Sequence, residues 1–113
     1  MHEYSIVQAL FERVAAEART RRATAVHRLS IRIGELSGVE PDLLTTAYET
    51  FRTETICAGA ALDLRVVPAR WTCPGCGRGF DRGDVLRCAA CGVPARLAGG
   101  DEIMLDRIEM EVP

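Results

Sequence analysis

Four of the five cysteines lie in a pattern that is typical of a metal site. Cys73 and Cys76 form one CxxC pair, and Cys88 and Cys91 form a second pair after eleven intervening residues. The two-residue gap lets both sulfurs of a pair reach the same ion. Two such pairs predict a tetrahedral four-cysteine zinc site with Zn–S distances of about 2.3 Å. Because a closed shell of thiolates leaves no open coordination position, the predicted zinc is structural rather than catalytic.

A redox CxxC and a nucleic-acid-binding zinc ribbon are the alternatives to this interpretation. A single CxxC between a strand and a helix is enough for redox chemistry, whereas both copies here lie in Gly- and Pro-rich sequence. The segment 70–97 carries five Arg against two Asp, and its Trp71 and Phe80 could stack on bases. These arginines are scattered, and the whole chain has a formal net charge of −2, so structural zinc is favoured over binding to phosphate backbones.

A second group of residues with metal chemistry is the N-terminal Met1-His2-Glu3. The free amine of Met1 and the amide nitrogen of His2 can close a five-membered chelate ring, and the same amide and the His2 Nδ1 can close a six-membered ring. Three nitrogens in one plane favour square-planar Ni(II) or Cu(II). A fourth position remains for the Glu3 amide, for a carboxylate from Glu3 or Glu40, or for water. By residue type alone, a His at position two is more often a surface residue on a frayed chain end than a metal ligand.

The spacing of the apolar residues predicts the elements that position these groups. A helical stripe runs over residues 4–19, and Pro41 fits the first turn of a second helix that runs to residue 51. Alternating apolar and polar residues predict half-buried strands over 27–33, 62–68 and 102–112. A bulge near Asp106 is expected to reconcile the two phases of the last strand. We expect His27 in the core or at its edge, and Cys57 as a small buried hydrophobe.

The predicted fold class is α+β: a small three-stranded sheet with two helices on one face, plus an inserted four-cysteine, zinc-ribbon-like module. Residues 1–69 and 98–113 would form the body, and residues 70–97 the zinc-binding module, with Pro68 and Gly99-Gly100 as its hinges. The module has too few apolar residues for a core of its own. Metal binding must therefore supply much of its folding free energy, on the order of 10 kcal/mol.

Composition places the protein in a broad class. The chain has 113 residues, of which 48% are apolar and 27% charged, as in ordinary globular domains. No apolar run approaches the roughly 20 residues that span a membrane, and the N-terminus does not read as a signal peptide. Cysteines paired for metal rather than for disulfides fit a compartment that keeps thiols reduced, so we expect a cytoplasmic protein.

Several segments together resemble the HypA family, the nickel-incorporation factors of [NiFe]-hydrogenase maturation. The likeness runs over nearly the whole chain, with family-like spacing. It rests on the two CxxC pairs and on five further segments: Met1–Ser5, Ile33–Val39, Tyr48–Arg52, Gly100–Ile103 and Ile108–Glu111.

The resemblance implies a nickel metallochaperone rather than an enzyme. It implies that Ni(II) is bound by His2 and nearby backbone nitrogens, including the Met1 amine, and that Glu3 takes part in nickel binding or partner contact. Glu40 stands where an acidic residue has been linked to the nickel site, at a position where some members carry Asp. The four-cysteine zinc is structural in the family.

The resemblance also implies partners. These are a HypB-type GTPase, the hydrogenase large subunit and, for some members, urease maturation proteins. No membrane or nucleic-acid partner is expected, and both a monomer and a domain-swapped dimer fit the sequence. A zinc-ribbon nucleic-acid-binding protein or a structural adaptor is the alternative function.

Overall fold

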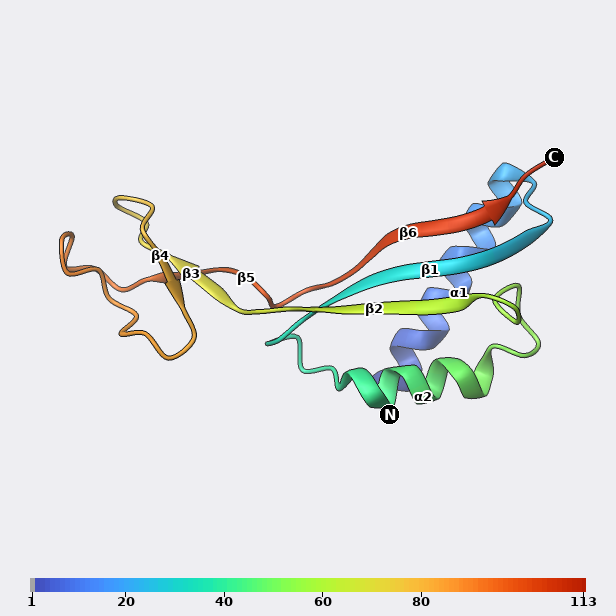
Figure 1. The fold of residues 1–113 in the computed structure, drawn as a ribbon, viewed down its shortest axis with the longest axis horizontal. Coiled ribbons are helices and arrows are strands. Elements are labelled where there is room, and N and C mark those ends of the chain that lie inside the picture. The colour runs from blue at the N-terminus through green and yellow to red at the C-terminus, as the bar shows by residue number, and fades with distance from the viewer. Residues whose placement is uncertain (1) are drawn as a thin grey trace.

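The computed structural model describes residues 2–113, without the side chain of His2, and contains two sheets at opposite ends of an elongated molecule (Figure 1). One end is built from α1 (His2–Arg21), β1 (Ala25–Gly34), α2 (Pro41–Phe51), β2 (Ala61–Val67) and β6 (Ile103–Glu111). The other end is built from β3 (Arg70–Thr72), β4 (Gly79–Asp81) and β5 (Arg96–Gly99). Within the described residues 2–113, neither α1 nor α2 is long and apolar enough to cross a membrane.

The larger sheet has the strand order β2-β1-β6. β1 is parallel to β2 and antiparallel to β6, and the parallel pair is possible because α2 lies in the long connection between β1 and β2. Leu29, Ile31 and Ile33 of β1 are buried on one face of the sheet, and this face shares one core with both helices. The prediction of three strands with two helices on one face is therefore confirmed. The helices supply Val7, Leu10, Phe11, Val14, Leu44, Ala47 and Tyr48 to this core.

The predicted bulge in β6 is present at Asp106. Ser30 pairs with Arg107 and Ile31 pairs with Leu105, so Asp106 is the extra residue between them. A bulge shifts the side-chain alternation by one position. Leu105 and the even-numbered Ile108 can therefore both pack against the same core.

A second bulge, at His27, corrects one expectation. Val26 pairs with Met110 and Arg28 pairs with Glu109, which leaves His27 as the extra residue of β1. The bulge brings Val26, 3% exposed, into the core instead of His27. The expectation that His27 lies on the apolar face is wrong, because its side chain is 58% exposed and its Nε2 lies 3.6 Å from the Glu111 carboxylate.

The smaller sheet has the order β4-β3-β5, with both strand pairs antiparallel. Its core consists of Phe80, Cys73 and Cys88, with Trp71, Val93 and Ala95 packed against them. Val85 is 81% exposed and contributes nothing to this core. So small an apolar cluster agrees with the expectation that the module cannot fold on apolar burial alone.

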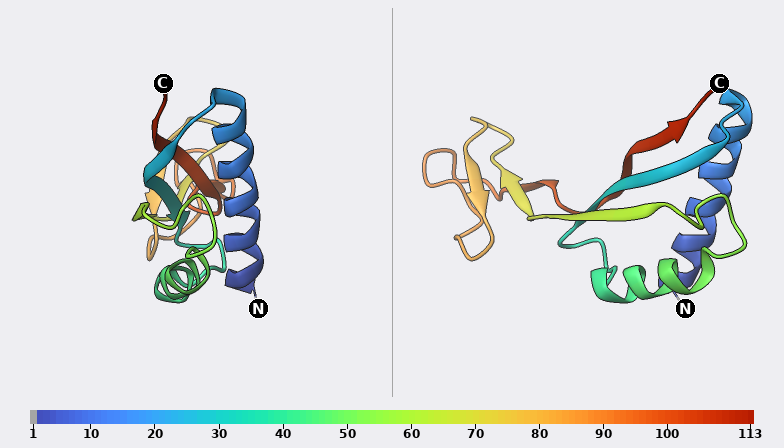
Figure 2. Two further views of the ribbon diagram at one scale, coloured as in Figure 1. Left: turned by 90° about the vertical axis from the view of Figure 1, so that its right-hand side faces the viewer. Right: turned by 45° about the vertical axis from the view of Figure 1, so that its right-hand side comes forward.

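The two sheets are joined where three small residues meet. The strands that lead to and from the smaller sheet cross at Ala69 and Gly100, beside the end of β1 at Gly34 (Figure 2). A Cβ on Gly100 would lie 2.5 Å from the Ala69 Cα, and Gly100 has φ +90°. Residues without bulky side chains are required here because the backbones approach so closely.

Candidate metal sites

The structure brings the four cysteines of the two CxxC pairs together in the smaller end of the molecule. Their sulfur atoms all lie within 4.8 Å of one another. Cys73 and Cys88, the first residue of each pair, are buried, whereas Cys76 and Cys91 are exposed. The result is a four-cysteine metal-binding group at the surface of the module.

Both CxxC pairs use the same backbone turn. The N–H of Gly77 donates to the Cys73 carbonyl at 2.8 Å, and the N–H of Gly92 donates to the Cys88 carbonyl at 2.7 Å. Gly77 and Gly92 have φ angles of 79° and 69°, which residues with a Cβ adopt only at a cost. A glycine directly after each pair therefore lets both sulfurs of the pair turn toward one point.

The sulfur positions suit a tetrahedral ion. The Sγ atoms of Cys76 and Cys88 lie 3.7 Å apart. A tetrahedron with Zn–S bonds of 2.3 Å places its sulfurs about 3.8 Å apart. A set of four soft thiolates without oxygen or nitrogen ligands also suits zinc better than a hard cation. The donor atoms of this chain therefore fit a zinc ion in both spacing and chemistry.

The pKa values of two of the thiols, Cys73 and Cys91, are shifted in opposite directions. A hydrogen bond from the Cys76 N–H lowers the pKa of the Cys73 thiol to about 7. Hydrogen bonds with Cys73 and its neighbours raise the pKa of the Cys91 thiol to about 12. Negative charge on one sulfur thus disfavours it on the next. A divalent cation is what allows all four sulfurs to be thiolates at once.

Arginines surround this cysteine group. Arg87 donates from NH1 to the Gly92 carbonyl at 2.7 Å, which ties it to the second CxxC turn. Arg78 lies over the Phe80 ring, 5.7 Å from its centroid. Four thiolates around a divalent cation keep a net negative charge, so part of the arginine excess of the module offsets it. The sequence reasoning missed Arg87, although a basic residue directly before Cys88 is a readable signal.

The predicted N-terminal ligand set is described in part. Met1 and the side chain of His2 lie outside the described residues. Glu3 and Glu40 lie together, because the backbone N–H of Glu40 donates to Glu3 Oε2 over a long 3.5 Å. The Glu40 side chain caps α2 by accepting the Asp42 N–H at 3.4 Å through Oε1. The two acids thus meet where the Glu3 side chain reaches the N-terminal cap of α2.

An aromatic contact fixes the first turn of α1. The rings of Tyr4 and Phe51 pack edge to face, with centroids 4.8 Å apart and planes at 71°. This contact joins the beginning of α1 to the end of α2. Glu3 therefore projects from a helix turn that is held against the body rather than from a loose tail.

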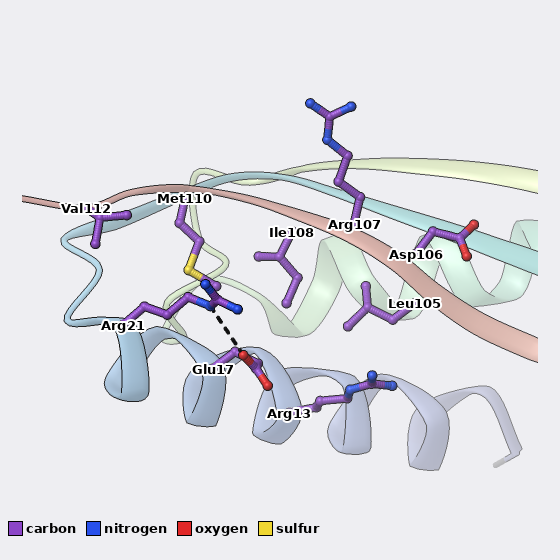
Figure 3. Close-up of a pocket in the computed structure, with 9 residues that line it drawn as sticks. All are labelled: Arg13, Glu17, Arg21, Leu105, Asp106, Arg107, Ile108, Met110 and Val112. Carbon is purple, nitrogen blue, oxygen red and sulfur yellow. Dashed lines mark ion pairs between the residues drawn. The ribbon is translucent and has the colours of Figure 1, made fainter.

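A groove of about 480 Å³ lies between α1 and β6 (Figure 3). Its lining includes neither the four cysteines nor Glu3 and Glu40. Its charged lining includes Arg13, Glu17 and Arg21, and Glu17 and Arg21 form an ion pair at 3.5 Å. The lining residues include no Ser, Cys or His. No lining residue of the groove therefore supplies a hydroxyl or thiol nucleophile or a histidine base.

An α+β body that carries a four-cysteine module defines a small two-part metal-binding protein. The family model described as hydrogenase/urease nickel incorporation, metallochaperone, hypA matches residues 1–110. The chain therefore belongs to the HypA family.

Curated relatives agree with this assignment. The chain is 39% identical to the hydrogenase maturation factor HypA of Wolinella succinogenes, over 98% of this chain and 96% of that protein. It is 41% identical to HypA of Shewanella oneidensis, over 98% of this chain and 96% of that protein. Both relatives match along nearly their full length, so no large part of their architecture lacks a counterpart here.

Solved structures support the same fold. The solution structure of the Ni metallochaperone HypA from Helicobacter pylori matches with a TM-score of 0.73 and 29% identity, over 98% of both chains. A second solution structure of a HypA protein matches with a TM-score of 0.79 and 32% identity, over 97% of this chain and 96% of that chain. The fold of this chain, including its smaller sheet, is thus matched nearly end to end by solved structures of HypA proteins.

Proposed function

We propose that the protein is a nickel metallochaperone that binds Ni(II) at its N-terminus and delivers it for [NiFe]-hydrogenase maturation. The observation that carries this proposal is the match to the nickel-incorporation family over residues 1–110. Delivery takes place with a HypB-type GTPase, and the hydrogenase large subunit is the recipient. The family description names urease beside hydrogenase, which makes urease a second candidate recipient.

The proposed nickel ligands are the Met1 amine, the amide and side chain of His2, and a carboxylate from Glu3 or Glu40. Three points support this set. The first N–H groups of a helix have no acceptor within it, so the amides at the start of α1 are not committed to the helix. Glu3 and Glu40 also lie together at this point. The Oε2 atom of Glu40 has no hydrogen-bond partner among residues 2–113, so it remains available.

The proposed role of the four-cysteine group is to hold a structural zinc. The sulfur spacing and the small apolar cluster of the module support this role. With its thiolates occupied by zinc, the protein leaves nickel to nitrogen and oxygen ligands. We further propose the division into a body of residues 1–69 and 98–113 and a module of residues 70–97. The two separate sheets support this division, with β5 of the smaller sheet running two residues further, to Gly99.

A chaperone must hold its ion firmly and still release it. A site at a chain end, with one exchangeable position, lets a partner's ligand enter before a chaperone ligand leaves. A buried cage made only of protein groups would block such a step. This logic favours cargo binding over catalysis, and we propose a cytoplasmic protein that is not an enzyme and acts as a monomer or a dimer.

Nickel titration and metal analysis of the untagged protein test this proposal. We expect one nickel and one zinc per monomer. His2→Ala should lose nickel while retaining zinc and the fold. The matched control is His27→Ala, since His27 is an exposed histidine on β1 and no proposed ligand. Nickel binding by His2→Ala equal to that of the parent would rule out the N-terminal site.

The role of the free amine needs its own comparison. A short peptide extension before Met1 converts the amine into an amide and should weaken nickel binding strongly. An equal extension at the C-terminus is the control. Equal affinities of the two extended proteins would exclude the amine as a ligand.

A further inference from the structure

The carboxylate of Glu35, the first residue after β1, binds two separate segments of the chain. Its Oε1 accepts the backbone N–H of Ala69 at 2.8 Å, and its Oε2 accepts NH1 of Arg82 at 2.6 Å. Ala69 is only 1% exposed, so its N–H needs an acceptor inside the protein. One oxygen of Glu35 is thus committed to the junction between the sheets, and the other points to the module.

Arg82 is fixed to the smaller sheet by a tight turn. The N–H of Asp81 donates to Asp84 Oδ2 at 2.7 Å, and the N–H of Asp84 donates to the Asp81 carbonyl at 3.1 Å. Asp81 ends β4 and pairs with Arg70 of β3. The guanidinium of Arg82 therefore moves with the whole four-cysteine module.

The contact between Glu35 and Arg82 differs from the other ion pairs of residues 2–113. Each of the others lies either within the body or within the module. The chain itself passes between the body and the module twice, once through Ala69 and once through Gly100, and these two segments lie against each other. Two chain segments alone leave the module free to twist relative to the body. The ion pair between Glu35 and Arg82 is a further contact, away from these segments, that can fix the orientation of the module.

We propose that Glu35 and Arg82 form a latch that sets the orientation of the four-cysteine module relative to the body. The side chains are 28% and 66% exposed, so the latch is reachable from solvent and can open and close reversibly. Glu35 positions the module and binds no metal.

The latch is also connected to the proposed nickel site through the loop that follows Glu35, and this part of the inference rests on the proposed function. Glu35 begins the loop that ends at Glu40, and the Glu40 N–H reaches Glu3. Within this loop the N–H of Leu36 donates to the Gly100 carbonyl at 2.7 Å, and the N–H of Val39 donates to Ser37 Oγ at 3.3 Å. This short loop, bonded within itself at Val39 and to Gly100 at Leu36, thus links the latch to the proposed nickel ligands.

Residual dipolar couplings of backbone amides in the zinc-loaded, full-length protein test the latch. We expect one alignment tensor to fit both sheets in the parent. Arg82→Gln removes the charge, and the two sheets should then require different tensors. Glu35→Gln is a second variant, which keeps an oxygen for Ala69. Arg82→Lys restores a charged donor and should return the sheets to one tensor.

Arg96→Gln is the matched control, because it removes the same charge from the module at a β5 residue with no ion-pair partner among residues 2–113. It should leave the single tensor unchanged. A single tensor in both Arg82→Gln and Glu35→Gln would overturn the latch, and so would separate tensors in the parent. Metal analysis of the same samples separates the two proposals: a parent without nickel binding refutes the chaperone function, while the couplings still decide the latch.

Discussion

Gly34 and Gly100 cross with no space for a side chain between them. A Cβ on Gly34 would lie 2.3 Å from the carbonyl carbon of Gly100, a distance that backbone atoms cannot accommodate without moving. The contact lies where β1 ends and the chain returns from the module. It therefore makes the backbone at this crossing intolerant of any added atom.

Gly34→Ala should lower the free energy of unfolding of the body by about 3 kcal/mol or more, because an overpacked site must displace rigid backbone. Thermal unfolding followed by circular dichroism measures the effect. Gly59→Ala is the control, since a Cβ at Gly59 meets no atom within 4 Å. Equal unfolding temperatures for the two variants would show that the crossing relaxes easily.

Tyr48→Phe should cost only about 1 kcal/mol of unfolding free energy, although Tyr48 is fully buried. Its hydroxyl donates to the Ala60 carbonyl at 2.8 Å, and Arg52 NH1 donates to the same oxygen at 2.7 Å. Arg52 therefore keeps the carbonyl satisfied after the substitution. Denaturant unfolding measures the loss, with the exposed Tyr4→Phe as the control.

The same argument predicts a non-additive pair. Arg52→Ala combined with Tyr48→Phe leaves the Ala60 carbonyl without either donor. The double variant should then lose more stability than the sum of the single variants. Additive losses would mean that water replaces both donors.

Cys88→Ser should abolish stable metal binding and unfold the module while the body stays folded. The body has its own core, whereas the module core includes the Cys88 side chain. Metal analysis and the amide spectrum of each sheet measure the two effects. The control is Cys57→Ala, because Cys57 lies in the body core and burial raises the pKa of its thiol.

The control should keep its full metal content and lose about 1 to 3 kcal/mol of unfolding free energy through the loss of buried volume. Retention of metal by Cys88→Ser would show that three thiolates suffice. Loss of metal by Cys57→Ala would place Cys57 in the metal chemistry instead.

The Glu35 contacts should resist mild acid. The Ala69 N–H, and after it the Arg82 guanidinium, lower the pKa of the Glu35 carboxyl below its usual value. A lowered pKa in the folded state means that the stabilisation is complete above the ordinary glutamate pKa. It is lost only as pH falls through the lowered value. The orientation of the module should thus be unchanged between neutral pH and about pH 5.

The Glu35 carboxyl carbon shift in NMR measures this titration directly. Its midpoint should lie below the ordinary glutamate value. In Glu35→Gln, the Ala69 amide shift should lose the matching pH dependence. A midpoint at or above the ordinary glutamate value would contradict the assigned hydrogen bonds.

Local patterns were sufficient to predict most of the body. Apolar periodicity placed both helices and three strands, and the change of phase in the last strand located the Asp106 bulge. The His27 bulge could not be found in this way, because β1 keeps an unbroken alternation that is compatible with His27 on the apolar face. Only pairing with β6 puts Val26 there instead. Val66 also fits the alternation of β2, yet it is 52% exposed.

The metal-binding groups likewise divide into those that local spacing predicts and those that depend on contacts between distant segments. CxxC spacing is a local property, so the sequence alone was enough to group the four cysteines. Glu3 and Glu40 were named as candidate carboxylates for one coordination position, but 37 positions separate them in the chain, and the fold is what brings them together. The contact from Glu35 to Arg82 spans 47 positions and depends on how two sheets cross, for which the sequence carries no local signal.

The Asp106 bulge also affects how the protein behaves at high concentration. β6 is an edge strand, and an exposed strand edge can pair with another chain. Asp106 interrupts the regular hydrogen-bonding edge, and its carboxylate forms an ion pair with Arg32 Nε of β1 at 2.7 Å. A second strand could pair with β6 only over short stretches on either side. The irregularity that lets β6 fill the core thereby also opposes aggregation of the folded protein through this edge.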